Sequence, residues 1–160
     1  MLGHLSIGVR DLDTAARFYD AVLAPIGWVR LWTENGVGYG PSGGNDKLAV
    51  FARPDAHPPG TGFHLCFNAP SDAAVDAFHA AAIANGGRDD GGPGLRPHFG
   101  PDYYACFVFD PESWKLCTSP AGERGRYRQA RRLVQTKLAR EIAAGNPLLR
   151  RARVEVRPRS

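Results

Sequence analysis

Two histidines stand at matching positions in two similar stretches of the sequence. His4 opens "HLSIGV" and His64 opens "HLCFNA", an offset of 60 residues. If equivalent strands of a pseudo-symmetric pair carry these side chains, a two-fold arrangement could point both at one centre. The alternative is two polar residues on solvated strand faces, which is common for histidine.

A second group of reactive side chains lies in "RPHFGPDYY", which its prolines and glycine mark as a loop. Loops held by rigid strands often carry function. His98 could exchange a proton near neutral pH, and Tyr103 or Tyr104 could donate a hydrogen bond to a substrate oxygen. The stretch therefore supplies candidate catalytic residues, and a well-packed aromatic turn is the alternative.

Aromatic and amide side chains near the strand-like stretches are candidates for a substrate-binding wall. Small-molecule sites are typically apolar with a few polar groups. The candidates are Trp32, Tyr39, Phe51 and Asn68. The glycines around Tyr39 in "GYGPSGG" lack the required spacing and the lysine of a phosphate-binding loop, so no such loop is predicted.

A period of two in hydrophobicity predicts the strands that would carry the histidines. Leu5, Ile7 and Val9 share one face of the first strand, and His4 shares the other. A helix pattern follows at residues 12–23, and then come the strand-like stretches "WVRLWTE", "VGYG" and "KLAVFARP". The order recurs from "FHLCFNA" to "WKLCTS". The sequence therefore predicts an α+β fold with one strand, helix and three-strand unit used twice, in modules of about residues 1–56 and 57–120.

Three phrases, in this order, resemble the vicinal oxygen chelate superfamily, also called glyoxalase/bleomycin resistance/dioxygenase proteins. They are "HLSIGVRDLDTAARFYDAVLAPIGW", "GFHLCFNAPSDAAVDAFHAAAIANGG" and "RPHFGPDYYACFVFDPES", and the likeness covers about residues 2–118. The resemblance implies two βαβββ modules in tandem that form a cupped mixed sheet around a cleft, usually in a homodimer. It also implies a divalent metal held by a histidine on the first strand of each module and a glutamate on the last strand of the second.

Carried over by position, the metal ligands fall on His4, His64 and Cys117, since Cys117 stands where the superfamily has glutamate. Zinc is favoured if the thiolate ligates, whereas the two-histidine, one-carboxylate pattern of an oxygenase is broken, so a dioxygenase is the least supported activity. The first-module counterpart of Cys117 is Ala49, which cannot ligate. With a metal, the resemblance implies a lyase or isomerase acting on a small oxygen-bearing molecule. Without one, it implies a protein that binds or sequesters a drug-like molecule.

Charge divides the chain into a mildly acidic body and a basic tail. Residues 1–120 hold 8 Lys and Arg against 13 Asp and Glu, a net of −5, and residues 121–160 hold 12 against 3, a net of +9. The body would repel phosphate, so nucleic-acid binding would depend on the tail alone and is not favoured. Apolar residues at helical spacing predict a basic amphipathic helix in residues 121–160, docked on the body or on a partner subunit. A shifted reading frame near "DPES" would also explain both the tail and the missing glutamate.

Cysteine usage and the absence of long apolar runs indicate the compartment. No stretch has the length and apolar character of a membrane span, and the chain opens on a strand-like pattern rather than a leader. Three cysteines without framework spacing fit a reducing environment, with Cys66 and Cys106 expected to be packing residues. We therefore expect a cytoplasmic protein with no membrane partner.

Overall fold

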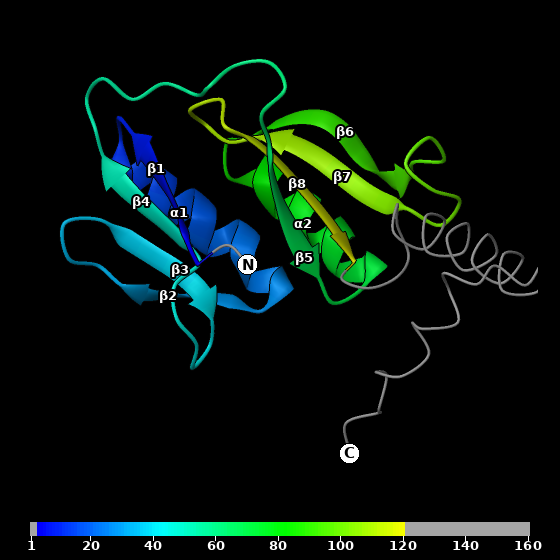
Figure 1. Cartoon of the computed structure of the whole chain (residues 1–160), viewed down its shortest axis with the longest axis horizontal. Helices are drawn as coiled ribbons and strands as arrows, with labels where there is room; N and C mark the ends of the chain where they lie inside the picture. The colour runs from blue at the N-terminus through cyan, green and yellow to red at the C-terminus, as the bar shows by residue number, and fades with distance from the viewer. Residues whose placement is uncertain (1–2, 121–160) are drawn as a thin grey trace, which may run out of the picture.

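The computed structural model describes residues 3–120, which form two modules with the same order of elements (Figure 1). The first module contains β1 (Leu5–Val9), α1 (Leu12–Leu23), the short 3-10 helix η1 (Ala24–Ile26), β2 (Trp28–Trp32), β3 (Val37–Pro41) and β4 (Leu48–Ala52). The second contains β5 (Leu65–Ala69), α2 (Asp72–Ala84), β6 (Arg88–Leu95), β7 (Tyr104–Phe109) and β8 (Lys115–Pro120). The prediction of an α+β fold with two βαβββ modules is confirmed.

Each module contributes one four-stranded mixed sheet. The strand orders are β1-β4-β3-β2 and β5-β8-β7-β6. The first strand of each module runs parallel to the last, and the other neighbours are antiparallel. The parallel pair needs a crossover connection, which explains why a helix follows the first strand of each unit. In residues 3–120 the strands form two separate sheets rather than the one cupped sheet expected from the sequence.

Local capping fixes both helices where the sequence predicts them. The Asp11 carboxylate accepts a hydrogen bond from the Thr14 amide at 3.0 Å, and the Ser71 hydroxyl accepts one from the Ala74 amide at 3.2 Å. Each cap satisfies an amide that the first helical turn leaves without an intrahelical partner. Gly27 closes η1 with a φ of 80°, a left-handed conformation that glycine adopts without steric cost.

One continuous core lies between the helices and the sheets and joins the modules. Helices α1 and α2 contact each other, and Figure 1 shows α2 behind β5 and β8. Trp28 of the first module meets Phe67 of the second edge to face, with ring centroids 5.4 Å apart. Phe67 in turn packs 6.1 Å from Phe78 of α2. Because the aromatic contacts cross the boundary, the two modules are not independent domains.

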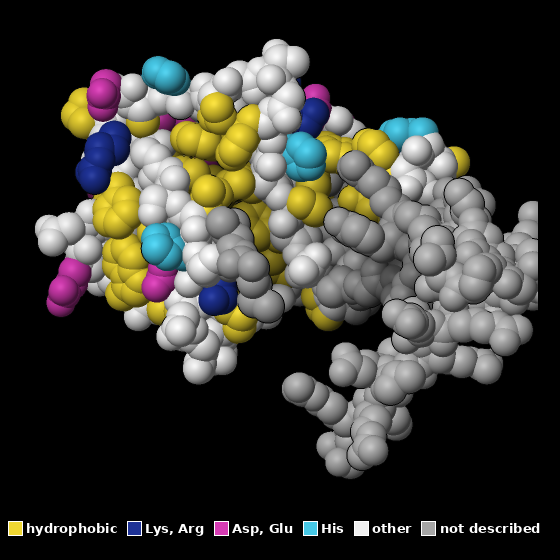
Figure 2. Space-filling model, viewed as in Figure 1, with side chains coloured by type: hydrophobic (Ala, Val, Ile, Leu, Met, Phe, Trp, Pro, Cys, Tyr) yellow, Lys and Arg dark blue, Asp and Glu magenta, His cyan; other side chains and the backbone are white. Residues whose placement is uncertain are grey.

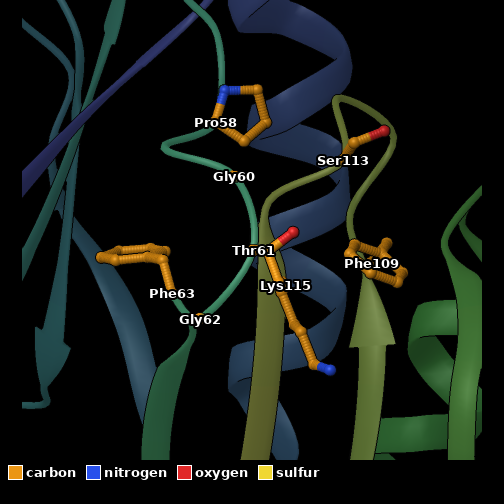
Figure 3. Close-up of a pocket in the computed structure, with 8 residues that line it drawn as sticks. All are labelled: Pro58, Gly60, Thr61, Gly62, Phe63, Phe109, Ser113 and Lys115. Atoms are coloured by element: carbon orange, nitrogen blue, oxygen red, sulfur yellow. The ribbon is translucent and has the colours of Figure 1, made fainter.

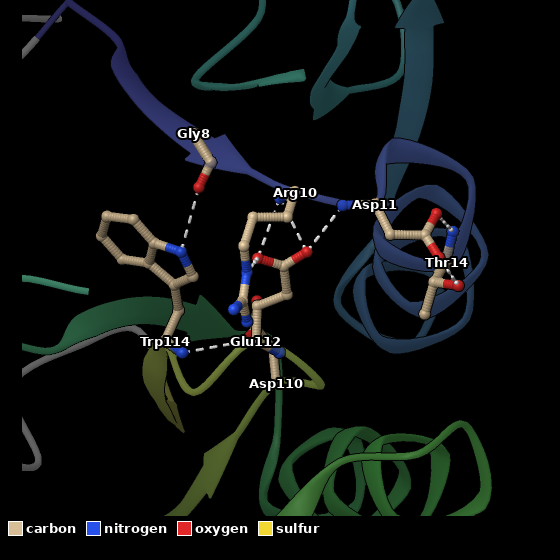
Figure 4. A network of polar contacts seen from close by, with 7 residues as sticks. All are labelled: Gly8, Arg10, Asp11, Thr14, Asp110, Glu112 and Trp114. Atoms are coloured by element: carbon tan, nitrogen blue, oxygen red, sulfur yellow. Dashed lines mark hydrogen bonds and ion pairs between the residues drawn. The ribbon is translucent and has the colours of Figure 1, made fainter. Parts of the chain in front are cut away.

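The turn between β7 and β8 forms a polar junction with the first module (Figure 4). The Glu112 carboxylate accepts hydrogen bonds from the backbone amides of Arg10 and Asp11, both at 2.7 Å. The Trp114 indole donates to the Gly8 carbonyl at 3.2 Å. Ser113 in this turn holds a φ of 72°, in the left-handed region that few side chains other than glycine adopt readily. The "DPES" turn thus has a structural role that the sequence did not reveal.

A buried carboxylate holds this turn in shape. Asp110 accepts hydrogen bonds from the backbone amides of Glu112 at 2.9 Å and Trp114 at 2.8 Å, and from the Tyr19 hydroxyl at 2.8 Å. Burial outweighs these hydrogen bonds and raises the pKa of Asp110 to about 6. The carboxylate links α1 to the turn before β8.

The predicted basic helix in residues 121–160 lies outside the described residues. Within the part of the chain that the structure describes, neither helix has the length and apolar character needed to cross a membrane.

Candidate functional site

The two sheets each have a face that no helix of their own module covers. We call the faces opposite α1 and α2 the first and second open faces. The strand phase places Trp32, Ala49 and Phe51 on the first open face, because their neighbours Val37, Leu48 and Val50 belong to the core on the helix side. On the second open face lie His64, Cys66, Asn68, Phe107, Phe109, Lys115, Cys117 and Ser119.

The predicted metal ligands lie on both modules. His4 is exposed just before β1, and His64 is exposed just before β5, with its ring centroid 6.2 Å from that of Phe107. Cys117 is buried in β8, directly opposite Cys66 of β5 in the parallel ladder. Cys117 thus lies on the face of β8 opposite the core residue Leu116.

These residues do not fit a three-ligand metal site within one chain. In residues 3–120, no three His, Cys, Asp or Glu side chains gather closely enough to hold an ion. Figure 2 shows histidine side chains at separate places on the visible surface. A hydrogen bond with Cys66, together with burial, raises the pKa of Cys117 well above the ordinary value for a thiol. A metal would have to displace that proton, because the thiolate is the ligand form.

The first open face is largely occupied by the protein's own aromatic rings. Trp32 lies across Gly38, so close that a Cβ built on Gly38 would stand 2.1 Å from the indole. The Trp32 and Phe51 ring centroids are 5.9 Å apart. These two predicted wall residues are thus together, whereas Asn68 belongs to the other sheet.

The prediction of Tyr39 as a cleft wall residue is wrong. Its side chain is fully buried on the helix side of β3, where the hydroxyl donates to the Ala16 carbonyl at 3.1 Å and contacts an Asp20 oxygen at 3.2 Å. Burial, and secondarily Asp20, raises the pKa of Tyr39. Asp20 also pairs with Arg30. Tyr39 therefore fixes α1 to its sheet.

The predicted catalytic loop forms a cluster of tilted and edge-to-face aromatic rings. The His98 ring lies 4.1 Å from the Phe99 ring, which lies 5.4 Å from that of Tyr103. Tyr104 points the other way, since its hydroxyl donates to Asp76 of α2 at 2.7 Å. The hydrogen bond with Asp76 raises the pKa of Tyr104. His98 and Tyr103 thus share a loop, whereas Tyr104 lies on the side opposite the second open face.

A cavity of about 240 Å³ lies between the linker that joins the modules and the β7–β8 turn (Figure 3). Its lining comes from both segments: Pro58, Gly60, Thr61, Gly62, Phe63, Phe109, Ser113 and Lys115. Apolar lining with one charged side chain is typical of a small-molecule site. Lys115 is half-buried and pairs with Asp90 at 2.6 Å.

Cations and aromatic rings alternate beside this cavity. The Arg88 guanidinium lies 4.1 Å from the centre of the Phe109 ring, and that of Arg96 lies 5.9 Å from Phe107. The Lys115 ammonium lies 5.4 Å from Phe107 and 5.8 Å from Phe109. A cation within about 6 Å of a ring centroid is attracted to the ring face. The second open face therefore presents positive charge over apolar rings.

The predicted substrate-binding residues do not line the cavity, and its own lining residues were missed. One signal was present: Lys115 alternates with Leu116 and so shares the face of Cys117. The stretch "HPPGTGF" between the modules also carried a loop signature. Nothing in the one-dimensional pattern placed this linker against the "DPES" turn.

A family model supports the resemblance seen in the sequence. The model of the Glyoxalase/Bleomycin resistance protein/Dioxygenase superfamily matches residues 1–118. The chain belongs to this superfamily. No curated protein matches the chain.

Solved structures of the superfamily share its fold. A glyoxalase/bleomycin resistance protein from Albidiferax ferrireducens is 33% identical, with a TM-score of 0.62 over 74% of this chain and 97% of that one. A putative glyoxalase from Bacillus halodurans is 27% identical, with a TM-score of 0.53 over 75% and 95% of the two chains. The fosfomycin resistance protein FosX from Listeria monocytogenes is 14% identical, with a TM-score of 0.58 over 79% and 97%, and this likeness concerns the fold alone.

Proposed function

We propose that this superfamily member binds a small anionic aromatic molecule in the cavity beside Lys115. The observation that carries the proposal is the cavity of about 240 Å³ lined by Phe63, Phe109 and Lys115. Its apolar rings match a flat ligand, and the ammonium group supplies a counter-charge. This corresponds to the metal-free binding protein that is one of the two functions implied by the superfamily resemblance.

The charges around the cavity favour an anion over a neutral ligand. Lys115 has one carboxylate partner, Asp90, while Arg88 of β6 and Arg96, just after β6, add positive charge. A ligand carboxylate can approach Lys115 while its ring contacts Phe109. Charge-assisted hydrogen bonds of this kind are about twice as strong as neutral ones.

Calorimetry with matched probes tests the proposal. We expect benzoate or salicylate to bind more tightly than benzamide or salicylamide, which have the same shape without the charge. Lys115→Met should weaken benzoate binding by about tenfold, which corresponds to roughly 1.4 kcal/mol. Lys47→Met, which changes an exposed lysine on the first module, is the matched control. Equal binding of benzoate and benzamide, or equal affinity in both variants, would refute the proposal.

A metal-dependent lyase or isomerase is the second candidate, favoured by the equivalent positions of His4 and His64. Zinc remains the favoured ion if Cys117 ligates. Elemental analysis of protein purified without chelators or a metal-affinity tag tests this function. Near-stoichiometric zinc that is lost in Cys117→Ser would support it. A metal-free protein that gains an ion in Cys117→Glu would indicate a site disabled at one ligand.

The homodimer implied by the superfamily resemblance stays a prediction, as does the cytoplasmic compartment. Light scattering of the full chain measures the mass in solution. A mass of one chain at micromolar concentration would contradict the dimer.

A further inference from the structure

Cys66 and Cys117 stand side by side on the second open face. They are direct partners in the parallel ladder between β5 and β8 and share one face of the sheet. Cys66 is exposed, whereas Cys117 is only 1% exposed. The Cys66 sulfur also lies 4.0 Å from the Ser119 hydroxyl. The expectation of Cys66 as a packing residue is therefore wrong, because it carries a thiol at the surface of the open face.

The third cysteine is separated from this pair by the sheet itself. Cys106 is buried on the helix side of β7, where its thiol donates to the Val75 carbonyl at 3.7 Å. Burial raises the pKa of this thiol to about 12. Cys106 therefore provides an internal comparison for the reactivity of the pair.

We infer that Cys66 and Cys117 form a dithiol site that binds a neutral trivalent thiophilic compound, such as an organic arsenical, through both sulfurs. The exposed thiol of Cys66 offers the first point of attachment. The thiol of Cys117 then closes the chelate without a change in the backbone, because the two residues are ladder partners on one face of the sheet. Soft sulfur ligands prefer soft acceptor atoms.

Neighbouring side chains favour an uncharged organic compound over a metal cation. Lys115 lies two residues before Cys117 on the same face and holds positive charge near the pair. Phe107 is the ladder partner of Cys117 on its other side, and His64 packs against that ring. An aryl group can pack against Phe107, a contact that a bare metal ion cannot make. The inference does not depend on the ligand proposed for the cavity.

The bond changes balance without an oxidant. With phenylarsine oxide as the probe, each sulfur forms one bond to arsenic and each thiol gives up one proton. The two protons leave with the arsenic-bound oxygen as one water molecule, and arsenic stays trivalent. Attachment through a single thiol would add the whole probe and release no water. The mass of the adduct therefore reports whether one or two sulfurs have reacted.

Mass spectrometry of the reduced, desalted full chain tests the inference. We expect one adduct whose mass is that of protein plus probe less one water. Excess monothiol should not remove it, whereas a small dithiol should. Chelation by two tethered groups commonly strengthens binding by about 10²-fold or more, so Cys66→Ser should release the probe at least that much more readily.

Matched cysteine variants show whether the probe is chelated by Cys66 and Cys117 together or reacts with any accessible thiol. Cys117→Ala should give only the heavier single-thiol adduct, and Cys106→Ala should behave as wild type. If Cys117→Ala fails to fold, the exposed Cys66→Ser substitution still carries the test. A wild type that forms no adduct less one water, or an equal loss of that adduct in Cys106→Ala, would overturn the inference. Loss of benzoate binding in Lys115→Met with retention of the arsenical adduct would separate the two sites.

Discussion

The carboxylate of Glu112 accepts hydrogen bonds from two groups of Arg10, its backbone amide at 2.7 and 2.9 Å and its guanidinium Nε at 3.1 Å. The contact joins residues 102 positions apart. It attaches the β7–β8 turn to the segment that leads from β1 into α1 (Figure 4). The turn that borders the cavity is thus held by the other module.

Glu112→Gln should lower the free energy of unfolding by about 2 kcal/mol. A hydrogen bond to a charged group contributes about 1.5–3 kcal/mol, and the glutamine amide keeps only one of the two oxygens that accept these bonds. Burial raises the pKa of Glu112, but the Arg10 and Asp11 amides outweigh it and leave the pKa below its ordinary value. The stabilisation is therefore lost as pH falls through the acid range. Urea denaturation measures the change, with Glu34→Gln in the exposed β2–β3 turn as the control. Equal stability of the two variants would contradict the prediction.

Asp110 should affect the pH dependence of stability in the sense opposite to Glu112, and Asp110→Asn should remove this effect. The folded-state pKa of Asp110 is about 6 against an ordinary value of 3.8, so the folded state binds more protons between these pH values. Stability from this group is therefore fully present below about pH 4 and falls as pH rises through about 6. Relative to the Asn variant, the free energy of unfolding of the wild type should fall by up to about 3 kcal/mol between pH 4 and 7. Parallel stability curves for the two proteins would show that Asp110 does not titrate in this range.

Gly38→Ala should displace Trp32 from the first sheet. A Cβ at this position would stand 2.1 Å from two atoms of the indole, and real atoms do not approach so closely. Overpacking of this kind costs about 1–3 kcal/mol. Chemical denaturation and acrylamide quenching of tryptophan fluorescence measure the loss of stability and the exposure of the ring. Gly3→Ala, where nothing lies within 4 Å of the new Cβ, should leave both unchanged.

Tyr39→Phe should destabilise the protein by about 1 kcal/mol and leave benzoate affinity unchanged. The substitution removes the hydroxyl that contacts the Ala16 carbonyl and Asp20, and it leaves the carbonyl without this donor. Thermal unfolding and calorimetry provide the two readouts. A loss of benzoate affinity without a loss of stability would show that Tyr39 contributes to ligand binding.

The repeated pattern was sufficient to predict the modules. Alternation in "HLSIGV" and "FHLCFNA" reflects burial of one strand face, which is determined within short stretches of chain. Tyr39 was misplaced because Gly38 and Gly40 flank it. Glycines carry no polarity signal, so the phase of β3 could not be assigned from the sequence.

The candidate site depended on contacts between distant segments, which a single sequence does not encode in a readable pattern. Thr61 of the linker and Ser113 of the "DPES" turn line the same cavity although 52 positions separate them. The pairing of Cys66 with Cys117 required the register of the β5–β8 ladder. Strand phase placed Cys117 on the correct face, but not beside a second thiol.

The indole of Trp32 resting on Gly38 shows how the two modules differ in use. The first module covers its own sheet surface with aromatic rings, whereas the second presents cations, thiols and a cavity. Directed evolution of ligand preference should therefore yield most of its gains from mutations in the second module and the linker before it.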